Sequence, residues 1–336
     1  MRELQGLDSV NAYSVRCARD DGYVGRVVRA PNFRAHPAHG RRWERHVALP
    51  LRLRTTARER RPDVFLSFRN LHAPRVRPPR IVVSVLDLAP LVTPWYHPNP
   101  ARRAVRRRLA ERAIAQGDHF VAISEFSKAA LLERFGVPEG RLTVAHLAAD
   151  PSFGPVDDDA REAVRTRYRL PERFVLTLGG GDPRKNVATA VAAARGLPRD
   201  VPLVVAGGAW HGRQCERVSD RVRVLGRVAD ADLAALYGLA DVLVFLSLYE
   251  GFGLPPLEAM ACGTAVVCSR TTSLPEVVGD AAVLVDPLDV EAVAGELTAL
   301  LEDDARRREL VARGRRRAAG FSWRQTAAAV LRALTG

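Results

Sequence analysis

The chain has 336 residues, of which 47% are hydrophobic and 26% charged, which is enough for two domains of about 150 residues each. No apolar run approaches the roughly 18 residues that cross a bilayer, and the opening residues lack the basic head and apolar stretch of a secretory signal. The four cysteines form no CxxC pair and no metal-ligand cluster, so we expect core cysteines in a cytoplasmic protein.

The formal net charge of +13 lies entirely in the first half of the chain. Residues 1–155 hold 27 Lys and Arg against 14 Asp and Glu, whereas the rest of the chain holds 24 of each. The basic run at 101–112 fits a solvated or acceptor-facing surface, or contact with an anionic membrane. Nucleic acid is not expected as a partner, because the chain has no aromatic RNA-binding motif, helix-turn-helix signature or zinc knuckle.

In the first half, short apolar runs alternate with helical patterns, which favours a parallel α/β domain. The predicted strands are 62–68, 80–86 and 119–124, and the predicted helices are 101–117 and 124–136. A stretch rich in Pro, Gly and Asp at 149–160 is typical of a linker.

The second half alternates more strictly and predicts a doubly wound domain with helices on both faces of a parallel sheet. The predicted strands are 174–178, 202–207, 222–226, 241–246, 264–269 and 281–286. The predicted helices are 186–196, 230–240, 255–261 and 289–303. The fold class is therefore α/β, with two Rossmann-like domains facing across a cleft. Ligands of such sheets bind beyond the carboxyl ends of the strands, so the residues directly after each strand are the candidates for a site.

The first candidate loop is "GGGDPRKN", which follows the predicted strand 174–178. Glycines such as Gly180 and Gly181 let the backbone approach a ligand closely, although such a loop is also a common turn. It is neither a Walker loop nor GxGxxG. Arg184 and Lys185 come just before a helix, and Lys185 is one of only two lysines in the chain. A compact ammonium beside a planar guanidinium suits a pyrophosphate.

The second candidate loop is "SLYEGFGLPPLEAMA", which follows the predicted strand 241–246. Gly251 and Gly253 permit a tight turn, and the two prolines after it fit the first turn of a helix whose amides favour an anion. Glu250 precedes this turn and Glu258 lies one turn inside the helix, on the order of 10 Å away. Two carboxylates that flank an anion site suit a ligand with a hydroxyl-rich group at each end and phosphates in the middle, such as a sugar, a diphosphate and a ribose. The alternative is a helix-capping glutamate and a surface glutamate.

These motifs resemble the family 4 retaining glycosyltransferases, which have the GT-B fold and belong to the group 1 glycosyltransferases. The stretch "EGFGLPPLEAMACGTAVV" carries the family signature of Glu, seven residues and Glu. "GGGDPRKN" upstream and "SLPEVVGDAAVLVDP" downstream are also similar to that family, as are "SEFSKAALLERFGV" and the closing "FSWRQTAAAVLRALTG". The resemblance covers the chain from about residue 60 to its end.

The resemblance implies catalytic roles for three residues. Arg184 and Lys185 would neutralise the donor diphosphate, with Gly180 and Gly181 close by, and Glu250 would contact hydroxyls of the transferred sugar. Retention without an obvious nucleophile implies attack on the same face of the sugar, with a donor phosphate oxygen taking the acceptor proton.

The resemblance also implies a set of donor contacts. Glu258 would accept the ribose hydroxyls, and the loop after the strand 222–226 would meet the base through its backbone. The donor-binding set thus adds Arg227, Val228, Gly251, Phe252, Gly253, Leu254 and Glu258. No cofactor and no metal are expected. The acidic triplets "DDD" (157–159) and "DAD" (230–232) look like metal-binding DxD motifs, but each starts a predicted helix, so we expect both to cap helices.

The acceptor-side candidates lie in the first half, after predicted strands or at a helix start. They are Asp87, His72, His97 and Ser124; lone histidines are often ordinary surface residues, and capping alone accounts for a serine at a helix start. The chain departs from the family at Leu86, where members usually carry a histidine that touches the donor sugar. Residues 1–18 resemble the end of a helix running into the second strand, so we expect the N-terminal domain to lack its first strand.

The predicted domains are an acceptor-side Rossmann-like domain at 1–155, a nucleotide-sugar-binding Rossmann-like domain at 156–319 and a final helix at 320–336 that packs back on the first domain. The implied function is metal-independent, retaining transfer of a mannose- or glucose-like hexose from a nucleotide sugar to a glycan, lipid-linked or natural-product acceptor. The alternative is a non-catalytic pseudoenzyme that binds nucleotide sugar or a protein partner. A cytoplasmic location is expected, with peripheral contact at the inner membrane surface as an open alternative.

Overall fold

The structure is a computed structural model that describes residues 13–17, 33–37, 63–67, 70, 71, 73, 80–93, 99–208 and 221–336. The chain folds into two compact units. Unit 1 comprises residues 1–146 and 323–336, and unit 2 comprises residues 147–322. The sequence places the corresponding boundaries at 155/156 and 319/320.

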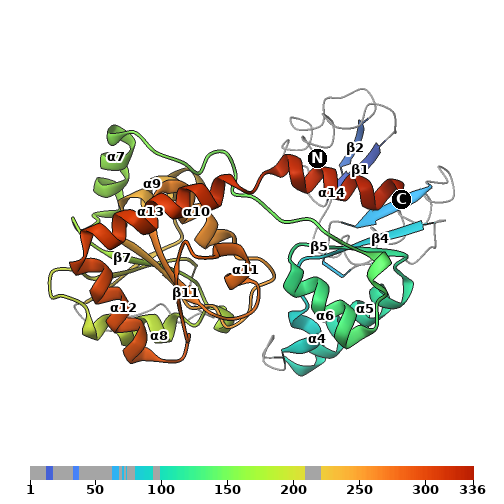
Figure 1. The fold of residues 1–336 in the computed structure, drawn as a ribbon, viewed down its shortest axis with the longest axis horizontal. Coiled ribbons are helices and arrows are strands. Elements are labelled where there is room, and N and C mark those ends of the chain that lie inside the picture. Colours follow the sequence, from blue (N-terminus) through green and yellow to red (C-terminus); the bar gives the residue numbers. More distant parts are fainter. Residues whose placement is uncertain are drawn as a thin grey trace. The chain divides into compact units, whose positions relative to one another are not determined.

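Unit 1 contains a parallel sheet in the order β3-β4-β5-β6 (Figure 1). Its strands are β3 (Val64–Ser67), β4 (Arg80–Val85), β5 (His119–Ala122) and β6 (Leu142–Val144), and a separate parallel pair is formed by β1 (Tyr13–Cys17) and β2 (Phe33–Pro37). The first three strands of the sheet are the predicted ones, whereas the sequence pattern does not reveal β2 or β6. The absence of a first strand stays a prediction, because residues 1–12 and 18–32 are outside the described residues.

The two longer helices between the strands of unit 1 each begin at a residue whose side chain caps the helix. Asn99 accepts a hydrogen bond from Arg102 N, and Ser124 accepts one from Ser127 N. An N-cap of this kind satisfies one of the amides that a helix start leaves unpaired. The elements are α4 (Ala89–Val92), α5 (Pro100–Gln116), α6 (Glu125–Phe135) and the 3-10 turn η1 (Glu139–Arg141). Both helices predicted in this half are confirmed.

The last helix of the chain, α14 (Trp323–Thr335), packs on the sheet of unit 1. Its buried residues Ala327 and Val330 share a hydrophobic cluster with Val82 and Val121. Ile81, which is next to Val82 in β4, belongs instead to the cluster that includes buried residues of α5 and α6. Because successive side chains of a strand point to opposite faces, α14 covers one face of this sheet, and α5 and α6 cover the other.

Unit 2 contains a six-stranded parallel sheet in the order β12-β11-β10-β7-β8-β9. All six strands are the predicted ones: β7 (Val175–Leu178), β8 (Leu203–Ala206), β9 (Val222–Gly226), β10 (Val242–Phe245), β11 (Ala265–Ser269) and β12 (Val283–Val285). The strand order reverses between β7 and β10, which are neighbours. Ligands bind beyond the carboxyl ends of the strands at such a switch point. The loops after β7 and β10 are the two candidate loops of the sequence.

Helices cover both faces of this sheet, as predicted. In Figure 1, α8 and α12 lie on one side of it, and α9, α10 and α13 on the other. The helical elements are α7 (Asp158–Tyr168), η2 (Pro183–Lys185), α8 (Val187–Ala193), η3 (Ala194–Gly196), η4 (Asp230–Asp232), α9 (Leu233–Leu239), α10 (Leu254–Cys262), α11 (Leu274–Val278), α12 (Val290–Glu302) and α13 (Asp304–Ala319). Helix α13 is not apparent in the sequence pattern, because its run of arginines hides a narrow apolar face.

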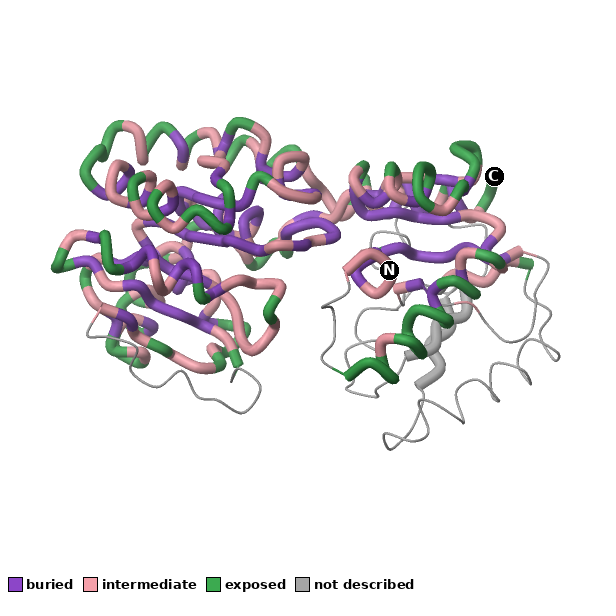
Figure 2. Tube along the Cα trace, turned by 90° about the horizontal axis from the view of Figure 1, so that it is seen from below, coloured by how far each residue is buried: buried purple, intermediate pink, exposed green. Residues whose placement is uncertain are grey.

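Strands β4, β8, β10 and β11 are almost entirely buried, and purple stretches of the tube run through each unit in Figure 2. Cys262 of α10 and Cys268 of β11 are both buried in unit 2. Burial raises the pKa of the Cys262 and Cys268 thiols to about 12, so both are protonated near neutral pH and behave as small core residues, as predicted. None of the helices that the structure describes combines the length and apolarity needed to span a membrane.

Candidate functional site

The loop after β7 is held close to the loop after β8 by glycines. A Cβ atom on Gly180 would lie 2.5 Å from the carbonyl oxygen of Gly208, and Gly207 has a φ of +146°, which disfavours a side chain. Gly179 N also donates a hydrogen bond to Ala206 O. The glycines of "GGGDPRKN" therefore permit two backbones to meet at this edge of the sheet.

Arg184 and Lys185 lie in the 3-10 turn η2, directly after these glycines. Asp182 begins the turn: its carboxylate accepts a hydrogen bond from Arg184 N at 3.0 Å and pairs with the Arg184 guanidinium at 2.7 Å. Burial alone would raise the pKa of the Asp182 carboxyl, but the bonds from Arg184 outweigh it and the pKa lies below its usual value. Asp182 is not among the site residues predicted from the sequence, and its carboxylate binds the Arg184 side chain.

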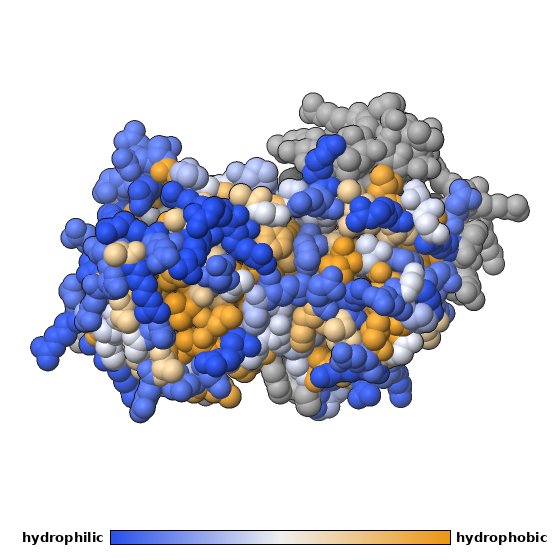
Figure 3. Space-filling model, viewed as in Figure 1, coloured by the Kyte–Doolittle hydropathy of each residue, from blue (hydrophilic) through white to orange (hydrophobic). Residues whose placement is uncertain are grey.

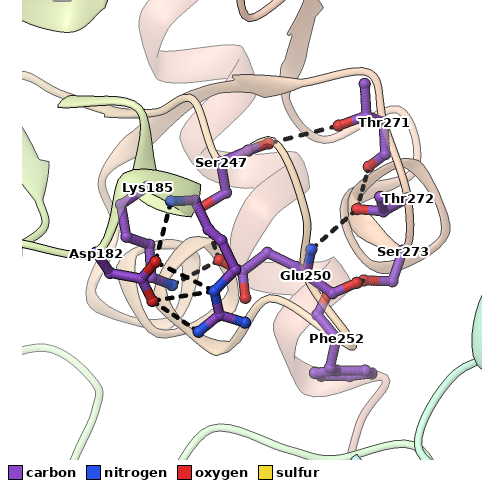
Figure 4. Close-up of polar contacts among 9 residues, drawn as sticks. Asp182, Lys185, Ser247, Glu250, Phe252, Thr271, Thr272 and Ser273 are labelled. Carbon is purple, nitrogen blue, oxygen red and sulfur yellow. Dashed lines mark hydrogen bonds and ion pairs between the residues drawn. The ribbon is translucent and has the colours of Figure 1, made fainter. Parts of the chain in front are cut away.

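Lys185 is joined to the second candidate loop through Glu250. Its Nζ atom lies 2.5 Å from Glu250 Oε1, and Ser247 Oγ donates to the same carboxylate oxygen at 2.6 Å (Figure 4). The ammonium also lies 4.8 Å from the centre of the Phe245 ring, at the end of β10. The backbone links the loops as well, because Leu248 N donates to Arg184 O at 2.7 Å. The structure thus brings Lys185 and Glu250 together, although 65 residues separate them in the chain.

A third loop, after β11, supports the Glu250 backbone with hydroxyl groups (Figure 4). Thr272 Oγ1 accepts a hydrogen bond from Glu250 N at 3.2 Å. Thr272 itself has a φ of +58°, in the left-handed region of backbone conformation. The fully buried Ser273 Oγ lies within hydrogen-bond distance of Glu250 O, at 3.0 Å, and of Phe252 O, at 2.8 Å. Neither residue is among the site residues predicted from the sequence. The available signal is a run of hydroxyl side chains directly after a buried strand, "SRTTS".

The turn at residues 251–253 leads into α10 and leaves few amides free. Gly253 is the N-cap residue with a φ of +115°, and prolines occupy the first turn, as predicted. Pro255 and Pro256 have no N–H, so Gly253 and Leu254 supply the amides at this helix start that can meet an anion. Phe252 is buried, and its ring packs edge-on against Phe321 with 5.8 Å between centroids.

Glu258 lies in α10 and is held by Tyr237 of α9. The Tyr237 hydroxyl donates to Glu258 Oε2 at 2.9 Å. Burial raises the pKa of the Glu258 carboxyl, and the negative charge of Asp150 raises it further, while the bond from Tyr237 opposes them. The two glutamates of the site are therefore in different settings: Glu250 is paired with a cation and Glu258 is bound to a buried phenol.

The remaining donor-side candidates lie after β9. Arg227 is exposed and Val228 is partly buried. The two acidic triplets, at 157–159 and 230–232, differ in whether their side chains cap a helix. Asp157 caps α7 by accepting from Ala160 N, as predicted, but Asp232 makes no helix cap. Its carboxylate binds the Arg167 guanidinium at 2.6 Å and the Tyr168 hydroxyl at 2.8 Å instead.

On the acceptor side, Asp87 and Ser124 both stabilise helix starts. Asp87 Oδ1 accepts a hydrogen bond from Ala89 N, and the side chain of Asn70 binds the backbone of residues 86 and 87 from the neighbouring strand end. Ser124 is fully buried and caps α6. Leu86 is 37% exposed, so an apolar side chain stands at the end of β4. His72 and His97 lie outside the described residues.

No group of three or more His, Cys, Asp or Glu side chains that could hold a metal ion occurs among the residues that the structure describes. Within unit 2, the charged groups of the candidate site pair with one another: Arg184 with Asp182 and Lys185 with Glu250. Such a site offers two cations, two backbone amides and a second carboxylate, Glu258, to an anionic ligand with hydroxyl groups.

Two family models match the chain. The model of glycosyl transferases group 1 matches residues 160–317, and that of glycosyltransferase family 4 matches residues 8–153. The O-antigen chain mannosyltransferase B of Escherichia coli is 36% identical over 256 residues, which are 73% of this chain and 67% of that protein. The serotype-specific mannosyltransferase WbdA of Escherichia coli is 31% identical over 96% of this chain, which spans only 42% of WbdA.

Solved structures show the same fold. The sucrose-phosphate synthase of Thermosynechococcus elongatus has a TM-score of 0.73 at 22% identity, with 98% of this chain and 90% of that chain covered. Anabaena HepE in complex with UDP and glucose has a TM-score of 0.73 at 18% identity, with 96% and 91% covered. The chain belongs to the group 1 glycosyltransferases of family 4 and has their GT-B fold. Its mannosyltransferase relatives support hexosyl transfer and do not favour the pseudoenzyme alternative.

The turn before α10 yields a prediction about stability. A Cβ atom on Gly253 would lie 2.6 Å from Leu274 Cδ2 in a backbone conformation that L residues disfavour. Gly253→Ala should therefore lower the free energy of unfolding by about 2 to 4 kcal/mol in urea denaturation.

The control is Gly295→Ala, at an exposed position of α12 where a Cβ meets nothing within 4 Å. This change should raise the free energy of unfolding by about 0.5 to 1 kcal/mol, because alanine favours the helix. Wild-type stability of Gly253→Ala would show that the turn relaxes and does not demand glycine.

Proposed function

We propose that the chain is a retaining, metal-independent hexosyltransferase that uses a nucleotide-diphospho-sugar as its donor. The observation that carries the proposal is the meeting of Lys185 with Glu250 at the switch point of the unit 2 sheet, beside the start of α10. Arg184, Lys185 and the amides of Gly253 and Leu254 suit a diphosphate, because cations and free helix-start amides both favour phosphate oxygens.

Glu250 is proposed to serve the transferred sugar. In the structure it neutralises Lys185, so a bound diphosphate gives the ammonium a second anionic partner. The Glu250 carboxylate then has lone pairs for sugar hydroxyls and for the positive charge that develops as the anomeric bond breaks. Ser247, Thr272 and Ser273 hold it in place through the bonds described above.

The proposed reaction exchanges one bond for another on the same face of the sugar. The bond from the anomeric carbon to the donor phosphate oxygen breaks, and a bond to the acceptor oxygen forms. The acceptor proton passes to a phosphate oxygen of the leaving nucleoside diphosphate, so no protein nucleophile is needed. Glu258 binds the ribose, and the backbone at Arg227 and Val228 meets the base.

The relatives support the proposed substrates. Two are mannosyltransferases, and one structural neighbour is seen in complex with UDP and glucose. A mannose- or glucose-like hexose carried by GDP, UDP or dTDP is therefore proposed as donor. A glycan, lipid-linked or natural-product compound is proposed as acceptor, and the bacterial O-antigen relative favours the glycan.

The proposed activity is tested with a donor panel. GDP-mannose, UDP-glucose and dTDP-glucose are each incubated with p-nitrophenyl α-mannoside and with α-mannosyl oligosaccharides, and nucleoside diphosphate release is measured with and without EDTA. At least one donor should turn over equally in both conditions, and NMR of the product should show the donor's own anomeric configuration. Absence of turnover with every donor contradicts transferase activity, loss of turnover in EDTA contradicts metal independence, and the opposite anomer contradicts retention.

The two glutamates should differ in their kinetic effects. Glu258→Ala removes binding to a ribose that does not change during transfer, so donor KM should rise more than kcat falls, with nucleotide affinity reduced roughly 30- to 1000-fold. Glu250→Gln should lower kcat strongly and leave nucleoside diphosphate affinity unchanged or tighter, because it releases Lys185 from a carboxylate partner. Calorimetry settles the matter: if Glu250→Gln abolished diphosphate binding and Glu258→Ala left it intact, the two roles would be reversed.

Peripheral contact with an anionic membrane is proposed for α5. This helix has six arginines and one acidic residue, Glu111, which pairs with Arg107. Its outer side also exposes two apolar residues one turn apart, Val105 (57% exposed) and Leu109 (53% exposed). Hydrophilic residues cover most of the face drawn in Figure 3, with apolar groups among them. Arginines around an exposed apolar pair suit a surface of anionic headgroups.

Liposome sedimentation tests this contact. Binding to phosphatidylglycerol vesicles should fall steeply from low to physiological salt. Replacement of Val105 and Leu109 by serine should weaken the binding that remains at physiological salt, whereas Leu132→Ser, at an exposed position of α6, serves as the control. Equal binding to phosphatidylcholine and phosphatidylglycerol vesicles would argue against an electrostatic membrane contact.

A further inference from the structure

Tyr237 is the largest of the fully buried side chains that the structure describes, and the sequence analysis assigns it no role. It lies in α9, and its hydroxyl reaches across to α10, where it donates to Glu258 Oε2 at 2.9 Å. Burial raises the pKa of the Tyr237 hydroxyl well above its usual value, so the group remains a proton donor throughout the working pH range. A buried phenol needs a hydrogen-bond partner, and here that partner is a carboxylate of the candidate site.

Two further contacts, one to the backbone and one to the ring, hold Tyr237 in place. Thr264 Oγ1, itself buried, donates to Tyr237 O at 2.6 Å. The ring of Phe153 packs edge-on against the Tyr237 ring with 5.9 Å between centroids. Neighbours therefore hold both the backbone and the ring of Tyr237, which restricts the movement of its hydroxyl.

Glu258 has one carboxylate oxygen engaged and one available. Oε2 accepts the bond from Tyr237, and Oε1 has no hydrogen-bond partner among the residues that the structure describes. Glutamate side chains have several rotatable bonds, and their immobilisation in a complex costs binding free energy. A carboxylate that is fixed beforehand avoids this cost.

We propose that Tyr237 is a positioning residue for the nucleotide sugar: its hydroxyl fixes the Glu258 carboxylate so that Oε1 is presented to the ribose hydroxyls of the donor. This inference rests on the proposed function of Glu258. It adds a specific device, in which a residue that touches no substrate determines how well the ribose is held.

The same hydrogen bond affects the proton affinity of Glu258. Among the residues that the structure describes, the titratable groups that face this carboxyl are Tyr237 from α9, Asp150 from the segment before α7, and Cys262 from α10 itself. Burial and Asp150 raise the pKa of Glu258, and Tyr237 lowers it. Loss of the hydroxyl should therefore raise this pKa further. Ribose hydroxyls donate to the ionised carboxylate, so donor affinity should fall as the pH drops through the pKa of Glu258. Without the Tyr237 hydroxyl, that fall should begin at a higher pH than in the wild-type chain.

The test is calorimetric titration of the full chain with GDP-mannose and, in parallel, with UDP-glucose, between about pH 4 and pH 9. These donors carry phosphates that are already esterified on both sides, so the ligand itself does not gain a proton on phosphate near neutral pH. Tyr237→Phe should bind roughly 3- to 10-fold more weakly at the upper end of this range. The midpoint at which affinity is lost on acidification should move to higher pH.

Thr264→Val is the matched control. It removes a buried hydrogen bond to Tyr237 but leaves the phenol and the Glu258 carboxylate in place, so it should lower stability and keep the wild-type midpoint. Glu258→Gln should bind weakly without that pH dependence, and Tyr237→Phe should cause no further loss in this background. Equal effects of Tyr237→Phe and Thr264→Val, without a shift of the midpoint, would show that Tyr237 is only a packing residue.

The outcomes separate this inference from the proposed function. Weak binding by Glu258→Gln together with wild-type affinity and midpoint for Tyr237→Phe would overturn the positioning role and leave the ribose role of Glu258 standing. Wild-type binding by Glu258→Gln would overturn the ribose role and the positioning role together. Absence of binding of both donors to the wild-type chain would contradict the proposed donor site itself.

Discussion

The ion pair between Lys185 and Glu250 is the interaction on which the rest of the site depends. It joins the loops after β7 and β10, the two neighbouring strands at which the order of the unit 2 sheet reverses. Parallel strands place their carboxyl ends at one edge, so these loops must meet there, and their opposite charges decide how they meet. Ser247 shares the same carboxylate oxygen, and the backbone bond from Leu248 to Arg184 keeps the two loops in register.

The charges of the site balance one another. Each cation of the loop after β7 has its own carboxylate: Asp182 for Arg184 and Glu250 for Lys185. An isolated ammonium or guanidinium in a partly buried position would be costly, so this pairing stabilises the loop in the absence of donor. A diphosphate bound at the proposed donor site would give the Lys185 ammonium a second anionic partner beside Glu250, the carboxylate that is proposed to face the sugar. The charges that stabilise the loop are therefore the same ones that are proposed to bind the donor.

Much of the fold could be predicted because burial leaves a strong pattern. The six strands of unit 2 are short apolar runs without polar alternation, which is typical of a sheet covered on both faces. Elements without such a pattern were not predicted. Strand β6 has only three residues, and the arginines of α13 hide its buried face in the sequence pattern. The triplet "DAD" shows a different limit, because Asp232 begins a helix as predicted but pairs with Arg167 and Tyr168 from α7, and no local pattern shows that partner.

The sequence by itself determined which residue types stand after which strands: two cations after β7, and a glutamate, a glycine turn, two prolines and a second glutamate after β10. These features are local, because the glycines of a loop and the prolines of a first helical turn determine the backbone conformation of only a few neighbouring residues. Only the tertiary structure decided which partners these residues have. Lys185 reaches Glu250 from 65 residues away, and Glu258 meets Tyr237 because α9 and α10 pack together. Hydrogen bonds and ion pairs depend on distance in space, and spacing along the chain does not determine that distance between separate elements.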